Sequence, residues 1–459
     1  MKSVLLYIIL VAILVSIGCK KFVTVGNPPD QTLSDFVFMT DATATKAVTG
    51  IYIQMMTASE SFASGGISLY SGLSADELTY YTASARDEFL KNEIGKVGEN
   101  TISANFWKPA YNFIYSSNLC LEKLETAASL SPAVKKQLKG EALFIRGFTY
   151  FNLVNLFGRV PLITSSDYRI NAVKARTSEE EVYKQIEADL LEAENLLSDN
   201  YTDLSGLNNR TRANRFAATA LLARMYLYRK NWIEAEKKAS AVIASTTYAL
   251  ATNPIDVFLK TGKESIWQLQ NVVTTINTWD GLLIIPASAA AFPTYVMRDT
   301  LINSFEAGDK RFVAWTAGRV YNSVPIRYPF KYQVRQGTVS KEFYTVLRLA
   351  EQFLIRAEAR AQQGLLQPAK DDINMIRTRA GLANTAASSQ SQILDAVLKE
   401  RRVELFSEWG HRWFDLKRLD KAHGILSVLK PAWQSTDVLW PIPTDQLLLN
   451  PSLIQNPGY

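Results

Sequence analysis

The apolar residues of this chain recur mainly at three- and four-residue spacing, the repeat of a helix that buries one face. Start and stop signals agree with this pattern, since Ser178 precedes three glutamates and Gly364 and Gly381 stand just past predicted helix ends. The pattern predicts helices over residues 42–58, 104–130, 133–157, 179–197, 213–228, 232–243, 343–363, 368–379 and 393–409. We therefore expect a mostly α fold.

Two of the predicted helix pairs share a spacing of small residues. Ala223 and Ala235 are twelve residues apart across a predicted turn. Ala357 and Ala369 repeat this offset in a later pair. Small residues at such an offset let two antiparallel helices cross closely, as they do in tetratricopeptide repeats. The sequence therefore predicts a tetratricopeptide-like helical-repeat scaffold, formed by residues of about 41–57, 104–248 and 343–430.

Two irregular segments interrupt the helical pattern. Residues of about 58–103 are rich in Ser, Gly, Tyr and Thr, and residues of about 249–342 contain prolines that exclude a continuous helix. Long insertions on a rigid scaffold commonly carry function, so we expect these loop-rich insertions to face a ligand. The prolines of the last segment, 440–459, predict an extended chain over the helical body. Its expected apolar contacts are Leu447, Leu448, Leu449 and Leu453.

The first residues have the form of a secretory leader. A lysine precedes an apolar run of about 14 residues, which is shorter than the ~20 residues that cross a bilayer as a helix. Gly18 and Cys19 follow, and this pair resembles the lipobox of bacterial lipoproteins, in which the cysteine receives lipid. We expect a signal peptide over 1–18, a lipidated Cys19, and a flexible tether over 19–40. An uncleaved anchor and a plain signal peptide are the alternatives.

Composition narrows the possible functions. The chain has 459 residues, of which 47% are hydrophobic and 20% charged, as in an ordinary folded protein. The formal net charge is +6, but basic residues are interleaved with acidic ones, which argues against a nucleic-acid groove. Of the two cysteines, Cys120 has no partner if Cys19 is lipidated, so we expect a buried, inert thiol and no disulfide.

Four blocks in the C-terminal third carry a family resemblance. They read VLRLAEQFLIRAEARAQQG, AKDDINMIRTRAGL, KERRVELFSEWGHRWFDLKRL and LWPIPTDQLLLNPSLIQNPGY. In this order they resemble the SusD/RagB family of outer-membrane lipoproteins. The upstream segments FWKPAYNFIYSSN, GEALFIRGFTYFNLVNLFGRVPLI and GCKKF extend the resemblance over nearly the whole mature chain.

The resemblance implies a fold, a location and partners. It implies a single SusD-like domain over residues 41–459, anchored by lipid in the outer membrane and facing the outside. Members of the family partner a SusC-like TonB-dependent transporter and capture glycans, or peptides in the RagB branch. They are binding proteins and not enzymes, so we expect no cofactor. The ligand-facing insertions of this chain are short and match no family motif.

Enzyme chemistry finds little support in the sequence. The histidines, His411 and His423, have no Cys or His companion at metal-ligand spacing, and no catalytic motif is present. A glycosidase would need two carboxylates about 5–10 Å apart across a sugar linkage. The carboxylates that the insertions offer are Asp76, Glu77, Asp280, Asp299 and Glu306, and the sequence brings no two of them together. We expect no catalytic residue and no metal.

The aromatic residues of the two insertions are the candidate ligand contacts. Sugars present apolar C–H faces between hydroxyl groups, so they bind to flat rings with amides and charges nearby. The residues that we expect to bind ligand are Tyr80, Tyr81, Asn277, Trp279, Asp280, Trp315, Tyr321 and Tyr332. For each ring, burial in the core is the competing interpretation.

The leading hypothesis is a surface lipoprotein that captures oligosaccharide for a SusC-like transporter. Peptide capture is the alternative within the family. A secreted α-helical glycosidase and a structural repeat adaptor are the alternatives from other classes.

Overall fold

The computed structural model describes residues 34–80, 86–201, 209–321 and 323–459. The expected signal peptide, the expected lipidation site Cys19 and the candidate ligand residue Tyr81 lie outside these ranges. Within the described residues, no helix combines the length and the apolarity needed to cross a membrane.

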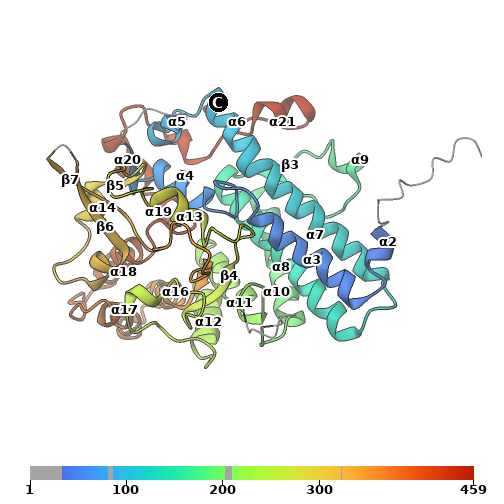
Figure 1. The fold of residues 1–459 in the computed structure, drawn as a ribbon, viewed down its shortest axis with the longest axis horizontal. Helices are drawn as coiled ribbons and strands as arrows, with labels where there is room; N and C mark the ends of the chain where they lie inside the picture. Colours follow the sequence, from blue (N-terminus) through green and yellow to red (C-terminus); the bar gives the residue numbers. More distant parts are fainter. Residues whose placement is uncertain (1–33, 81–85, 202–208, 322) are drawn as a thin grey trace, which may run out of the picture.

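The scaffold is built of long helices, as the apolar periodicity predicts (Figure 1). They are α3 (Asp41–Met55), α7 (Lys108–Thr126), α8 (Pro132–Phe157), α10 (Glu179–Leu196), α11 (Arg215–Tyr228), α12 (Trp232–Ile243), α16 (Leu349–Gln362), α17 (Leu366–Arg379) and α18 (Gln390–Glu404). Two predicted ends were wrong. The predicted helix 343–363 begins at Leu349, because the preceding residues form a strand. The predicted helix 393–409 ends at Glu404, because Ser407 and Trp409 take positive φ angles.

Successive helices pack as antiparallel neighbours, which confirms the tetratricopeptide-like arrangement. Helix α8 lies between α7 and α10, and α11 packs against α10 and α12. Helix α12 also packs against α16, although about a hundred residues separate them in the chain, so the stack continues across the second insertion. Ala223 and Ala235 are fully buried where α11 meets α12, and so are Ala357 and Ala369 where α16 meets α17.

The strands are short and form antiparallel pairs. The pairs are β1 (Leu78–Thr79) with β5 (Val296–Met297), β2 (Val160–Pro161) with β3 (Arg176–Thr177), β4 (Ser265–Leu269) with β8 (Tyr344–Arg348), and β6 (Thr316–Tyr321) with β7 (Val324–Pro329). Every residue of β4 and β8 is buried. This pair joins the two ends of the second insertion and fixes it to the core.

The first insertion is more helical than its composition suggests. It contains α4 (Gly66–Ser74), α5 (Asp87–Lys91) and α6 (Lys96–Ile102), and α6 runs through a π-helical turn, η2 (Ser103–Trp107), into α7. All residues of α4 are buried. Its small polar residues, which looked loop-like, allow close packing: the Ser68 hydroxyl accepts a hydrogen bond from the Trp409 backbone at 2.8 Å. The prediction of a loop-rich segment was wrong here for that reason.

The second insertion holds short elements between irregular stretches, as predicted. They are η3 (Pro254–Asp256), α13 (Trp279–Ile284), α14 (Asp299–Ile302) and α15 (Lys310–Trp315), besides the strands named above. In Figure 1, α14 and the strands β5, β6 and β7 lie at the side of the molecule opposite to α3 and α7, with α13 nearer the middle. The remaining elements are α2 (Ser34–Val37), α9 (Tyr168–Asn171), α19 (His411–Arg418), α20 (Ala422–Leu429), η4 (Ser435–Val438) and α21 (Thr444–Leu449).

The C-terminal segment is only partly extended. It contains α21, and two of the leucines that were expected to contact the body, Leu448 and Leu449, are exposed on this helix. Trp440 and Ile442, just before α21, are fully buried instead. The side-chain amide of Asn456 donates to the carbonyl oxygen of Trp440 at 2.8 Å. The other two predicted leucines, Leu447 and Leu453, do pack against the core. The terminus is therefore held by an indole, an isoleucine and an amide together with two of the four leucines.

Candidate ligand-binding site

The two insertions meet through backbone pairing. Strand β1 of the first insertion pairs with β5 of the second, with Leu78 opposite Met297. Next to this pair, the backbone amide of Arg298 donates to the carbonyl oxygen of Glu77 at 2.9 Å. The hydroxyl of Thr300 donates to the carbonyl oxygen of Asp76 at 3.1 Å. Segments more than two hundred residues apart in the chain are thus joined through a buried strand pair.

An aromatic and ionic cluster lies directly beyond β1. The ring of Tyr80 packs edge-on against that of Tyr295, with 6.2 Å between centroids. The guanidinium of Arg86 lies 5.7 Å from the Tyr295 centroid and pairs with Glu60 at 2.5 Å. The hydroxyl of Tyr70 donates to the same carboxylate at 2.7 Å. These contacts hold the start and the end of the segment between β1 and α5 against the second insertion.

The β6–β7 hairpin carries an exposed tyrosine, Tyr321. Alternate residues of a strand share a face, so Arg319 and Tyr321 of β6 lie on one side of the hairpin. Tyr321 is 50% exposed, and its ring lies 4.3 Å from that of Phe292, centroid to centroid. Arg319 donates to the carbonyl oxygens of Ser288 at 2.9 Å and Ala289 at 3.0 Å. The arginine therefore fixes the loop that carries Phe292 against the hairpin.

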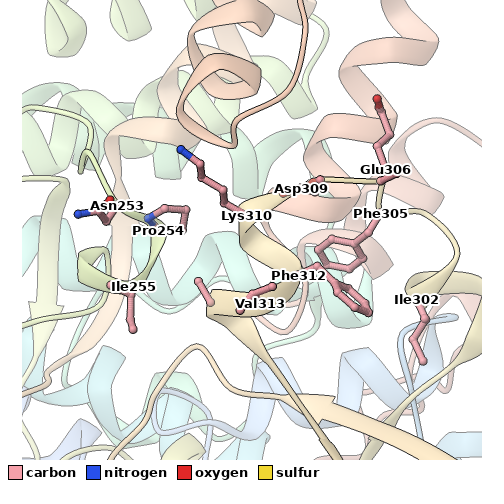
Figure 2. A pocket seen from close by; sticks show the side chains of 13 residues that line it. Asn253, Pro254, Ile255, Ile302, Phe305, Glu306, Asp309, Lys310, Phe312 and Val313 are labelled. Atoms are coloured by element: carbon pink, nitrogen blue, oxygen red, sulfur yellow. The ribbon is translucent and has the colours of Figure 1, made fainter.

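A cavity of about 750 Å³ lies within the second insertion, between η3, α14 and α15 (Figure 2). Figure 2 shows the rings of Phe305 and Phe312 side by side in the middle of its wall, with Ile302 to one side and Val313 to the other. The polar residues that line it are Asn253, Glu306, Asp309 and Lys310. Its volume lies in the range of small-ligand sites.

Three of the rings predicted to bind ligand lie in the interior. Trp315 is 0% exposed, and its indole nitrogen donates to the carbonyl oxygen of Pro254 at 2.7 Å. Trp279 is buried, and its indole nitrogen donates to the carbonyl oxygen of Met56 at 3.0 Å. The buried hydroxyl of Tyr332 accepts a hydrogen bond from a backbone amide of β8 at 2.9 Å. These rings present no open face to a ligand, because burying a large ring whose polar atom is bonded is favourable.

Asn277 and Asp280 are also buried, around α13. The side-chain oxygen of Asn277 accepts hydrogen bonds from the backbone amides of residues 341 and 342, so this amide braces the insertion. Among the described residues, the Oδ2 atom of Asp280 has no hydrogen-bond partner. It lies so close to Gly65 that a Cβ atom there would be 2.8 Å away. Burial raises the pKa of Asp280 to about 7.

Of the eight predicted contacts, Tyr321 is therefore the one that the described structure shows at the surface, while Tyr80 is buried against Tyr295. Sequence reasoning did not select Phe292, whose half-buried ring packs against the exposed ring of Tyr321. The signal available for it was its place in the segment SAAAFPTY, where a lone ring follows small residues and precedes a proline.

Of the five carboxylates considered for catalysis, Asp76 and Glu306 are in ion pairs. Asp76 pairs with Arg402 at 2.6 Å and Arg412 at 2.7 Å. Burial opposes ionisation of Asp76, but these guanidinium groups keep its pKa below the usual value. Burial, followed by the charge of Asp76, raises the pKa of the neighbouring Glu77 to about 7. Within the described ranges, no group of three or more His, Cys, Asp or Glu residues could hold a metal ion.

The histidine on α19 has a structural setting. His411 is buried, and burial, followed by the charges of Arg224 and Arg401, lowers its pKa well below the usual value. A neutral imidazole enclosed in this way has no route to a substrate from the surface of the insertions. The buried thiol of Cys120 likewise has a raised pKa, to about 12, because of burial, so it is a poor nucleophile.

Comparisons with known proteins agree on one family. A family model described as "Starch-binding associating with outer membrane" matches residues 38–227, and one described as "SusD family" matches residues 321–437. "SusD-like protein P2" of Formosa agariphila is 26% identical over 98% of each chain. A SusD superfamily protein of Bacteroides vulgatus superposes with a TM-score of 0.80 at 21% identity, over 92% of this chain and 100% of that one. A structure named "Laminarin binding SusD-like protein" superposes with a TM-score of 0.75 at 25% identity, over 91% and 99%.

Proposed function

This chain belongs to the SusD/RagB family, and on that premise we propose that it is a glycan-binding lipoprotein of the outer membrane. It captures oligosaccharide outside the cell and delivers it to a SusC-like TonB-dependent transporter. The solved relative whose name states that it binds laminarin supports a glycan as the ligand class. The protein binds its ligand and leaves it uncleaved.

The exposed ring of Tyr321, packed against the half-buried ring of Phe292, carries this proposal. A sugar ring covers an aromatic face with its C–H groups, and this packing needs a ring that is open to solvent but held rigidly. Tyr321 is open, and the hydrogen bonds of Arg319 to the loop of Phe292 supply the rigidity. Tyr81, which lies outside the described residues, is proposed as a further ligand contact.

The lipid anchor belongs to the same proposal. Cys19 receives the lipid, and the tether over 19–40 keeps the body beside its transporter while it moves. A single acyl chain binds a membrane only weakly, so two or three chains on the first mature residue give durable attachment. The anchor fixes the protein at the outer membrane, facing outward.

Substitution of the exposed tyrosine tests the proposal. Tyr321→Ala should weaken binding of a laminarin oligosaccharide by about tenfold, as expected when one stacked ring is lost, without changing the melting temperature. Isothermal titration calorimetry measures the affinity. Tyr168→Ala is the matched control, because Tyr168 is 76% exposed on α9, away from the insertions.

Three results would overturn the assignment. Equal loss of affinity in the Tyr321→Ala and Tyr168→Ala proteins would move the site away from the hairpin. Binding of peptides in place of every glycan in a mixed panel would favour the peptide-capturing branch of the family. Release of shorter sugars during incubation would contradict a purely binding role.

A further inference from the structure

The cavity beside α15 lies behind the opposite face of the β6–β7 hairpin from Tyr321. The strand register places Gly318 and Arg327 opposite each other on this second face. Arg327 reaches Phe312, with its guanidinium carbon 3.9 Å from the ring centroid. Phe312 in turn lines the cavity together with Phe305 (Figure 2). The hairpin thus borders two different surfaces, one aromatic and one with a cation stacked on a ring.

The acidic residues that line the cavity are already neutralised. Glu306 pairs with Arg377 at 2.8 Å and Lys399 at 2.9 Å, and the hydrogen bond from Arg377, above all, lowers its pKa to about 2. Figure 2 shows the Glu306 side chain directed away from the two phenylalanine rings. Asp309 is buried and pairs with Arg311 at 2.8 Å. Neither carboxylate leaves an unmatched negative charge at the cavity.

One cation of the cavity wall, Lys310, and one cation outside the wall, Arg327, have no such match among the described residues. Lys310 lines the cavity and is exposed, and within the described residues its ammonium group has no ion-pair partner. Arg327 donates to the hydroxyl of Thr316 at 2.6 Å, and no described carboxylate pairs with it. Desolvation lowers the pKa of Arg327. A partly desolvated cation without a counter-charge is costly, and an anion bound beside it would remove that cost.

The charge of the surrounding segment has the same sign. The second insertion, residues 249–342, carries ten Lys and Arg residues against seven Asp and Glu residues. This excess of three positive charges is half of the formal net charge of +6 of the whole chain. The insertion that holds the cavity is therefore positive overall, which favours an anionic ligand.

We propose that this cavity is a second sugar subsite, which takes an anionic unit of the captured glycan. The sugar ring packs against Phe305 and Phe312, and its charged group lies against Lys310 in the cavity wall, while Arg327, which stacks on Phe312, adds positive charge nearby. The charged group is a uronate carboxylate or a sulfate ester. This inference rests on the proposed function, and it narrows the ligand class from glycans in general to acidic glycans.

Calorimetry with the full-length lipoprotein in detergent tests the subsite. The probes are a tetragalacturonate, a sulfated carrageenan tetrasaccharide and a neutral laminarin tetrasaccharide. We expect at least one acidic probe to bind about tenfold more tightly than the neutral probe, and this preference to shrink as salt is raised. Lys310→Gln and Arg327→Gln should each remove about tenfold of the affinity for the acidic probe and leave the neutral probe unaffected.

Lys46→Gln is the matched control, since Lys46 is exposed on α3 and, among the described residues, has no ion-pair partner. It should change no affinity. Lys310 has no side-chain bond to lose, so Lys310→Gln should keep the melting temperature of the wild type and report on charge alone. The acidic probe that binds more tightly shows whether the charged group of the sugar is a carboxylate or a sulfate ester.

Two results separate the failure of this inference from that of the proposed function. The acidic subsite would be overturned if neutral and acidic probes bound with equal affinity and Lys310→Gln changed neither affinity. A lower glycan affinity of Tyr321→Ala would in that case still support glycan capture. Absence of binding to all three probes and to a wider glycan panel would overturn both. Preferential binding of acidic peptides would overturn the sugar subsite and favour peptide capture.

Discussion

Glu404, at the end of α18, shows how strongly the fold depends on buried charge. Its side chain is fully buried, and its two oxygens accept hydrogen bonds from Arg348 at 2.6 Å and from Arg311 at 2.9 Å. Arg379 donates to the same carboxylate. These arginines come from α15, β8 and α17, so a single carboxylate ties the second insertion to the C-terminal helices. We expect Glu404→Gln to weaken this connection severely.

The size of the effect follows from the hydrogen bonds lost. Hydrogen bonds to charged groups contribute about 1.5–3 kcal/mol each, and glutamine would keep one acceptor oxygen but turn an amide donor toward guanidinium donors. Glu408 also pairs with Arg348, at 2.7 Å, so part of the charge stays compensated. Removing one member of a buried ion pair typically costs about 3–5 kcal/mol, and we expect a loss of unfolding free energy in that range.

Urea denaturation followed by tryptophan fluorescence measures the loss. The control is Glu306→Gln, because Glu306 also pairs with two cations but its side chain is 35% exposed. Solvent screens such a pair, so its removal should cost about 1 kcal/mol or less. A loss below about 1 kcal/mol for Glu404→Gln, or equal losses for both variants, would refute the reasoning that burial makes this pair critical.

The pH dependence gives a second readout of the same carboxylate. Burial alone would raise the pKa of Glu404, but Arg379, Arg348 and Arg311 hold it well below 4.5. The unfolded chain therefore takes up a proton first as the pH falls, and the folded protein loses stability below about pH 4.5. Glu404→Gln should lose less of its remaining stability than the wild type does in this acidic range.

Two further substitutions test other parts of the fold. Burial raises the pKa of Asp280 from 3.8 to about 7, so folding becomes less favourable as the pH rises across this interval. Asp280→Asn should therefore raise the melting temperature at pH 8 and hardly change it below pH 4. An equal gain at both pH values would contradict the raised pKa. Ala223→Leu should lower the free energy of unfolding by about 1–3 kcal/mol in urea denaturation, because the larger side chain overpacks the crossing of α11 and α12. The control is Ala42→Leu, since Ala42 is exposed on α3. Equal losses in the two variants would argue against a close crossing.

Local patterns in the sequence determined the scaffold. The apolar periodicity gave the long helices, because its spacing is set within the helix itself; α12 buries one stripe, whereas α8 and α11 are buried on nearly all sides. The alanine pairs, such as Ala223 with Ala235, marked the close crossings, since a small side chain is the local condition for two backbones to approach. The family blocks of the C-terminal third add the SusD/RagB membership, which the family models confirm.

The composition of the insertions gave wrong predictions where tertiary contacts decide the structure. Its serines and glycines predicted a loop, but those of residues 66–74 form the buried helix α4, because small side chains also suit tight packing. Trp315 looked like a ligand platform, but Pro254 accepts its hydrogen bond and Lys331 lies 4.7 Å from its ring centroid. Neither neighbour lies near it in sequence, so no local pattern around Trp315 could reveal that it is enclosed.

The sequence by itself thus determined the helices, their pairing and the class of protein, because these follow from spacing along the chain and from motifs read in order. Only the tertiary structure decided which rings stay open to solvent. Phe292 meets Tyr321 because the β6–β7 hairpin turns one toward the other, and Arg327 meets Phe312 on the opposite face. The exposure of a side chain depends on which distant segments cover it, and that covering is set by the packing of the whole chain.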